Sequence, residues 1–224
     1  MKIADIPEYE KPREKAEALG IDSLTNAQLL ALLIRTGTRD ASAIEVSEKL
    51  LYQCGTLSQL SQQSVEQIAM VKGISKAKAF AIQACFEICR RTLIEDIMGK
   101  KLQNASDCTA WLKAELGSSA NEKLFVLYLN QMKLVSYEMI FEGSRYAMHI
   151  DVPQLVRKAV MHNSHQIILV HNHPSGDASP SDKDVTVTRD IMHAFLSVDI
   201  TLVDHLIIAG HDYFSFADSG LLYT

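Results

Sequence analysis

The chain has 224 residues, of which 47% are apolar and 22% charged, as in soluble globular proteins with room for one or two domains. Its net charge of −5 excludes a generally cationic surface that coats nucleic acid, but it allows a local basic patch. The N-terminus has no apolar signal core, no stretch approaches the length of a membrane span, and the four cysteines form no Cys-x-x-Cys pair. These features predict a cytoplasmic protein with free thiols and no membrane segment.

Residues 12–98 carry helical patterns, and none of this stretch alternates with a period of two. In TNAQLLALLIRTG, Thr25 and Gln28 can form a capping box, and Gly37 is a stop signal. ASAIEVSEKLLYQCG predicts a further helix that ends at Gly55. We therefore expect an all-helical N-terminal region.

The stretch VKGISKAKAFA at 71–81 predicts two helices joined by a short turn, similar to a helix-hairpin-helix element. Such a turn can meet a DNA backbone through its amides and nearby lysines, here Gly73, Lys76 and Lys78. Ser75 stands where the usual Gly-x-Gly hairpin has its second glycine. The alternative is a turn that only packs the domain, and the acidic net charge favours it, so any DNA contact should be weak and salt-sensitive.

After about residue 100 the pattern changes to strands that alternate with helices. The expected elements are a hairpin (123–131 and 133–143), a helix (151–163), a strand (166–173), a helix (181–198) and two strands (200–210 and 212–218). This order predicts an α/β sandwich. The polar stretch GKKLQN at 99–104 separates the two patterns, so we expect domains at 1–100 and 101–224.

The segment HNHPSGDASPSDKD at 171–184 follows an apolar strand and leads into a helix. Residues two apart in a strand point to the same side, so His171 and His173 would present both imidazoles together. Asp184 falls in the first turn of the helix that Ser181 caps. Two imidazoles and one carboxylate suit zinc with a fourth position left for water. The alternative is a capping pattern in which Asp184 serves only the helix.

His-x-His, seven residues and Ser-x-x-Asp resemble the JAMM motif of the MPN metalloprotease fold. Together with PREK, LLIRTGTR and LVDH, the segment is similar over essentially the whole chain to the bacterial RadC family. The resemblance implies an α/β MPN (JAB/cytidine-deaminase-like) sandwich behind an N-terminal all-α helix-hairpin-helix domain. It also implies zinc ligation by His171, His173 and Asp184.

The same resemblance implies two catalytic residues. Ser181 would donate a hydrogen bond to the developing oxyanion. An upstream glutamate at the start of an early strand would act as general acid/base. Glu122, just before KLFVLYL, fits that place, and Glu142, at the end of the next strand, is its competitor. His205 follows an apolar run and is either a partner of this site or a structural histidine.

The leading hypothesis is a zinc-dependent hydrolase, a JAMM-type metallopeptidase that acts on an amide bond in a peptide or protein substrate. The second is a DNA-associated accessory protein of repair or recombination with a structural or vestigial metal site. Phosphodiester cleavage is a third, although two-metal sites usually need more carboxylates. The chain lacks His-Glu-x-x-His, the zinc-deaminase pattern, a P-loop and a nucleophile elbow. The sequence carries no signal for the oligomeric state.

Overall fold

The computed structural model describes residue 7 and residues 11–143 and 150–222. The chain divides into two compact units, Met1–Cys89 and Arg90–Thr224. The sequence predicts the boundary in the polar stretch 99–104. The structure places it about ten residues earlier, between Cys89 and Arg90, inside helix α6 (Lys76–Ile97). The last turns of α6 belong to the second unit, because Ile94 packs there into a core with Leu102 and Ala105.

The N-terminal unit is helical throughout its described part, as predicted. Its elements are α1 (Pro12–Leu19), the 3₁₀ helix η3 (Ile21–Ser23), α2 (Asn26–Ile34), α3 (Ala43–Cys54), α4 (Leu57–Ser61), α5 (Val65–Ala69) and the start of α6. The expected capping box of Thr25 and Gln28 begins α2, and three more such boxes begin α3, α4 and α5. The short helix α4 was not predicted, because five residues are too few to show a helical period.

The turn between α5 and α6 packs tightly within the N-terminal unit. Gly73 has φ +105°, and a Cβ there would lie 2.8 Å from Thr38 Cγ2 and 2.9 Å from Val46 Cγ2. The Lys78 ammonium donates to two backbone carbonyls, those of Thr36 at 2.6 Å and Gly73 at 2.9 Å. Gly73 and Lys78 therefore hold the turn in place, whereas Lys76 is exposed at the first turn of α6.

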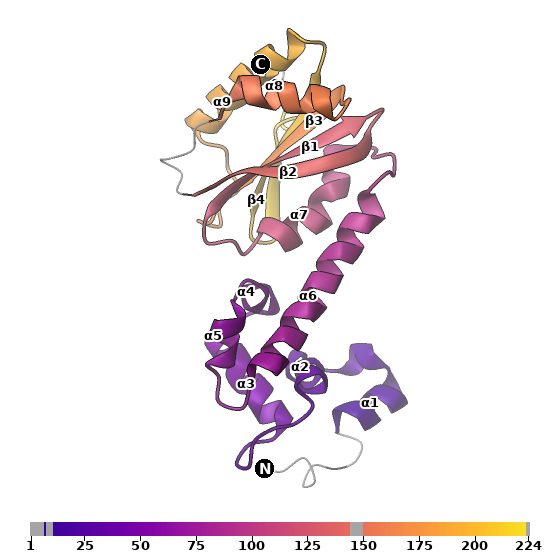
Figure 1. The fold of residues 1–224 in the computed structure, drawn as a ribbon, viewed down its shortest axis with the longest axis vertical. Helices are drawn as coiled ribbons and strands as arrows, with labels where there is room; N and C mark the ends of the chain where they lie inside the picture. The colour runs from indigo at the N-terminus through magenta and orange to yellow at the C-terminus, as the bar shows by residue number, and fades with distance from the viewer. Residues whose placement is uncertain (1–6, 8–10, 144–149, 223–224) are drawn as a thin grey trace. The chain divides into compact units, whose positions relative to one another are not determined.

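The C-terminal unit is built on a five-stranded sheet (Figure 1). Its strands are β1 (Glu122–Asn130), β2 (Lys133–Gly143), β3 (Gln166–Asn172), β4 (Thr201–Ala209) and β5 (Asp212–Ser215). Its helices are the 3₁₀ helix η4 (Ala105–Cys108), α7 (Thr109–Leu116), α8 (Val152–Met161) and α9 (Asp182–Leu196). The strand order is β2-β1-β3-β4-β5, with β3 and β4 parallel and the other pairs antiparallel.

Helices cover both faces of this sheet, which confirms the predicted α/β sandwich. Helix α7 packs Trp111, Leu112 and Leu116 against one face, and α8 and α9 pack against the other (Figure 1). Strands β1 and β3 are buried on both faces, which is why they appear in the sequence as nearly continuous apolar runs. Within the described residues, no helix combines the length and apolar character that a membrane span requires.

Candidate metal centre

Two strands and one helix of the C-terminal unit bring the predicted site residues to one region of the sheet. His171 lies on β3 and His173 follows the end of that strand, while Glu122 is the first residue of β1 and Asp184 lies in the first turn of α9. His171 is two residues after Leu169 and therefore points to the same face of the sheet, the face that α8 and α9 cover. Its ring points toward α9. The side chains of His171 and His173 are almost completely buried, at 4% and 5% exposure.

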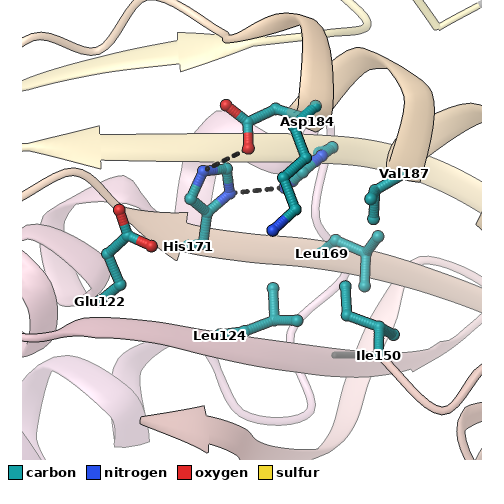
Figure 2. A pocket seen from close by; sticks show the side chains of 9 residues that line it. Glu122, Leu124, Ile150, Leu169, His171, Asp184 and Val187 are labelled. Atoms are coloured by element: carbon teal, nitrogen blue, oxygen red, sulfur yellow. Dashed lines mark hydrogen bonds and ion pairs between the residues drawn. The ribbon is translucent and has the colours of Figure 1, made fainter. Parts of the chain in front are cut away.

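The three expected ligands converge. The Nε2 atoms of His171 and His173 lie 3.0 Å apart. One carboxylate oxygen of Asp184 is 3.5 Å from the His171 Nε2 atom, and the other is 3.5 Å from the His173 Nε2 atom. Figure 2 shows the Asp184 carboxylate above the His171 ring. Within the described part of the chain, these three residues form the one group of His, Cys, Asp or Glu side chains arranged to hold a metal ion.

Asp184 is both a helix cap and a member of this cluster, so the two interpretations of Ser-x-x-Asp are compatible. Its Oδ2 atom accepts from the Ser181 amide at 2.8 Å and from the Ser181 hydroxyl at 2.5 Å, while the Ser181 Oγ atom accepts from the Asp184 amide. Its Oδ1 atom faces His171. Burial alone would raise the pKa of Asp184, but contacts with His173, Ser181 and His171 outweigh it and hold that pKa well below its usual value.

Each histidine of the cluster has a partner on its second ring nitrogen. The Nδ1 atom of His173 lies 2.8 Å from the carbonyl oxygen of Asp177. The Nδ1 atom of His171 lies 2.8 Å from Nε2 of His205, whose own Nδ1 is 2.6 Å from the Thr188 hydroxyl. His205 is therefore a partner of the site. Burial of His205 lowers its pKa to about 4, which favours the neutral ring at pH 7.

The structure separates the two candidate glutamates. Glu122 is 7% exposed and lines the same hollow as His171 and Asp184 (Figure 2). Glu142 pairs with Lys123 across the β1–β2 ladder and therefore points to the opposite face of the sheet. Its side chain is 42% exposed, with an oxygen 3.7 Å from the Lys123 ammonium. The geometry therefore favours Glu122 as the carboxylate beside the cluster.

Asn172, which sequence reasoning passed over, fixes the backbone on both sides of Glu122. It is 1% exposed and points away from the two histidines that flank it, to the other face of the sheet. Its Oδ1 atom accepts from the Lys123 amide at 2.8 Å, and its Nδ2 group donates to the Asn121 carbonyl at 3.0 Å. A polar residue between two strand histidines was the available signal, because a buried amide needs partners.

The hollow at the cluster is small and is lined by both apolar and ionisable side chains. Its volume is about 30 Å³, enough for about one water molecule. The lining residues are Glu122, Leu124, Ile150, Leu169, His171, Lys183, Asp184, Val187 and His205. Ser181 is not among them, because its hydroxyl is directed to Asp184. The resemblance to the MPN fold implies that substrate specificity would come from loops around the metal, such as 143–150 and 174–180, and residues 144–149 of the first loop lie outside the described part of the chain.

The donor atoms fit a metal cation. The Asp177 carbonyl can only accept, so the Nδ1 atom of His173 carries a proton, and in the uncharged ring the Nε2 atom has a lone pair. That lone pair faces the Nε2 atom of His171 at 3.0 Å and an Asp184 carboxylate oxygen at 3.5 Å. Electron-rich atoms brought this close together need a positive charge between them, either a proton or a metal ion, and two imidazoles with one carboxylate are ligands typical of zinc.

Comparisons with known proteins agree with this architecture. The model of the RadC-like JAB domain matches residues 102–221, and the UPF0758 N-terminal model matches residues 3–80. A UPF0758 protein of Dechloromonas aromatica is 38% identical over 99% of this chain and 100% of its own length. UPF0758 proteins of Chlorobaculum tepidum and Pelodictyon phaeoclathratiforme are each 37% identical over the same shares. The chain therefore belongs to the UPF0758, or RadC, family and carries a JAB domain in its C-terminal part.

Proposed function

We propose that this chain is a zinc-dependent metallohydrolase, a JAMM-type peptidase that cleaves an amide bond. The convergence of His171, His173 and Asp184 beside Glu122 is the observation that supports it. Three protein ligands leave zinc one open coordination position, which is typical of catalytic sites, whereas structural zinc sites use four. When bound, zinc supplies Lewis acidity, which polarises a carbonyl and makes water a nucleophile near neutral pH.

Glu122 is the proposed general acid/base. It is buried at the rim of a hollow with room for one water molecule, on the face of the sheet that carries His171. From this position its carboxylate would accept a proton from the attacking water and return it to the leaving amine. Asn172 would keep this carboxylate in place through the backbone of Asn121 and Lys123.

Ser181 is the proposed oxyanion donor. Its hydroxyl donates to Asp184 in the structure, so the role requires that this hydroxyl turn from the carboxylate to the substrate oxygen. Asp184 would still accept from the Ser181 amide at 2.8 Å during this exchange. Ser181 would thus stay in the helix cap, where its Oγ atom accepts from the Asp184 amide, while its proton serves the reaction.

The proposed substrate is a peptide or protein segment that crosses the mouth of the hollow. A volume of about 30 Å³ admits a water molecule but no amino-acid side chain, so the scissile carbonyl must approach from outside. The apolar residues Leu124, Ile150 and Val187 line this region, which favours a segment with an apolar side chain next to the cleaved bond.

The test is a peptide-mixture assay with the zinc-loaded full chain, in which new termini are identified by mass spectrometry. Wild type should generate them, and Glu122→Gln should bind zinc normally while losing about 100-fold or more in rate. Glu142→Gln is the matched control, and it should retain activity because Glu142 lies on the other face. Equal rates for wild type and Glu122→Gln would refute the assignment of Glu122, and cleavage that is unaffected by zinc removal would refute a zinc hydrolase.

A weak DNA contact by the N-terminal unit is the second candidate. The observation in its favour is the exposed Lys76 at the first turn of α6, directly after the Gly73 turn. Lys78 belongs to the packing of that turn, so we place the contact at Lys76 and the turn amides. Lys76→Ala should then reduce the slope of log affinity against log salt by about one unit. An unchanged slope would leave the turn with a packing role only.

A further inference from the structure

The chain of hydrogen bonds behind the metal cluster is not explained by the fold or by the three ligands alone. It starts at His171 on β3, passes through His205 on β4 and the Thr188 hydroxyl on α9, and returns to the backbone carbonyl of Asp184. We call these four groups the ligand relay. Thr188 and His205 are each 3% exposed, so bulk water does not compete for their hydrogen bonds.

The backbone carbonyl of Asp184, at one end of the relay, determines which atom donates in each of its hydrogen bonds. The Asp184 carbonyl can only accept, and the Thr188 Oγ1 atom lies 2.6 Å from it, so the single hydroxyl proton of Thr188 points to that carbonyl. Oγ1 must then accept from the other neighbour, Nδ1 of His205, at 2.6 Å. His205 therefore donates from Nδ1, and in the uncharged ring its Nε2 atom has the lone pair.

The same reasoning continues to the metal ligand. Nε2 of His205 is an acceptor, so the His171 Nδ1 atom 2.8 Å away must donate to it. The His171 proton is then on Nδ1, and its Nε2 lone pair points toward His173 and Asp184. Figure 2 shows the two contacts of His171, one on each ring nitrogen.

We propose that Thr188 and His205 are positioning residues that fix the tautomer of His171 and so prepare it to bind zinc. The relay also ends at the backbone of Asp184, so it connects two of the three ligands, which lie on different elements. The connection between Thr188 and Asp184 could be expected from the sequence, because Thr188 is four residues after Asp184 and lies on the same side of α9. The proposal rests on the zinc site of the proposed function, but it concerns metal affinity and not the reaction.

The decisive variant is Thr188→Val, which keeps the shape of the side chain and removes the acceptor of His205. Partners of this kind typically contribute about 10- to 100-fold to metal affinity, so zinc affinity, measured by competition with a chromophoric chelator, should fall by about that factor. Thr188→Ser keeps the hydroxyl and should restore wild-type affinity. Thr186→Val is the matched control, because Thr186 makes the same bond to Asp182 on the exposed side of α9, at 2.8 Å.

The outcomes separate this proposal from the proposed function. If wild type binds zinc tightly and Thr188→Val binds it equally well, the relay is refuted while the zinc site stands. If wild type fails to bind zinc, both are refuted. If Thr188→Val does not fold, ¹⁵N NMR of the histidine side chains in zinc-loaded wild type decides. His205 protonated on Nδ1 supports the relay, and His205 protonated on Nε2 overturns it, because that nitrogen could not then accept from His171.

Discussion

Replacement of Asn172 by alanine should destabilise the C-terminal unit and misplace Glu122. It removes the two bonds from the Asn172 side chain to the start of β1, the 2.8 Å bond from the Lys123 amide and the 3.0 Å bond to the Asn121 carbonyl. The Asn121 carbonyl still accepts from the Ser119 hydroxyl at 2.9 Å, but the half-buried amide of Lys123 loses its acceptor. A lost partner at a buried group costs about 1–3 kcal/mol, so we expect a loss of about 2 kcal/mol in the free energy of unfolding.

Urea unfolding followed by fluorescence measures this loss, because the single tryptophan, Trp111, is buried in the core of the C-terminal unit. Hydrolysis should fall by about 100-fold, as expected for a displacement of about 1 Å at a reacting group. Zinc affinity should stay unchanged, because the Asn172 side chain points away from the ligands. Asn130→Ala is the control, since Asn130 makes one 3.4 Å bond at the exposed end of β1. Loss of zinc in Asn172→Ala, or an unchanged stability, would refute this account.

Three further predictions concern stability. Burial raises the pKa of Asp204 above 3.8 despite its hydrogen bonds, so the stability that Asp204 contributes falls as pH rises from 3.8 through the raised pKa. Asp204→Asn, compared with wild type by urea unfolding at pH values from 3.8 upward, should remove this dependence, and an identical pH profile would contradict the sign. Gly73→Ala should destabilise the N-terminal unit by about 1–3 kcal/mol, because φ at this position is positive and the added Cβ atom would lie too close to Val46. Thermal unfolding followed by circular dichroism should show a transition at lower temperature, and an unchanged transition temperature would show that the turn adapts. Lys78→Ala should destabilise the same unit by about 1 kcal/mol, whereas Lys76→Ala should not; equal effects of the two would argue against a structural role for Lys78.

Much of the fold could be predicted because local signals and tertiary structure agree. The capping box at Thr25, the hairpin around Asn130 and the Ser181 cap all begin or end elements where the sequence indicates. Helices α4 and α7 were missed because short helices leave no clear period. The division inside α6 was also out of reach, since a single continuous helix gives no local signal of which turns belong to which unit.

At the site, the sequence indicated the cluster but not its supports. His171, His173 and Asp184 follow from strand alternation and a fixed spacing, so their convergence could be expected. The contacts of Asn172 with the start of β1 depend on the pairing of β1 with β3, which joins residues about 50 positions apart in the chain. The choice between Glu122 and Glu142 likewise needed the register of β1 against β2, which places them on opposite faces.

Zinc content of the purified full chain, measured by elemental mass spectrometry, tests the central claim most directly. Wild type and Glu122→Gln should each hold about one zinc ion per chain, and the double variant His171→Ala, His173→Ala should hold none. Retention of the Trp111 fluorescence of the folded C-terminal unit shows that such a loss is local. A folded wild type that takes up no zinc when it is supplied, or a double variant that keeps it, would contradict the metal centre and the function proposed from it.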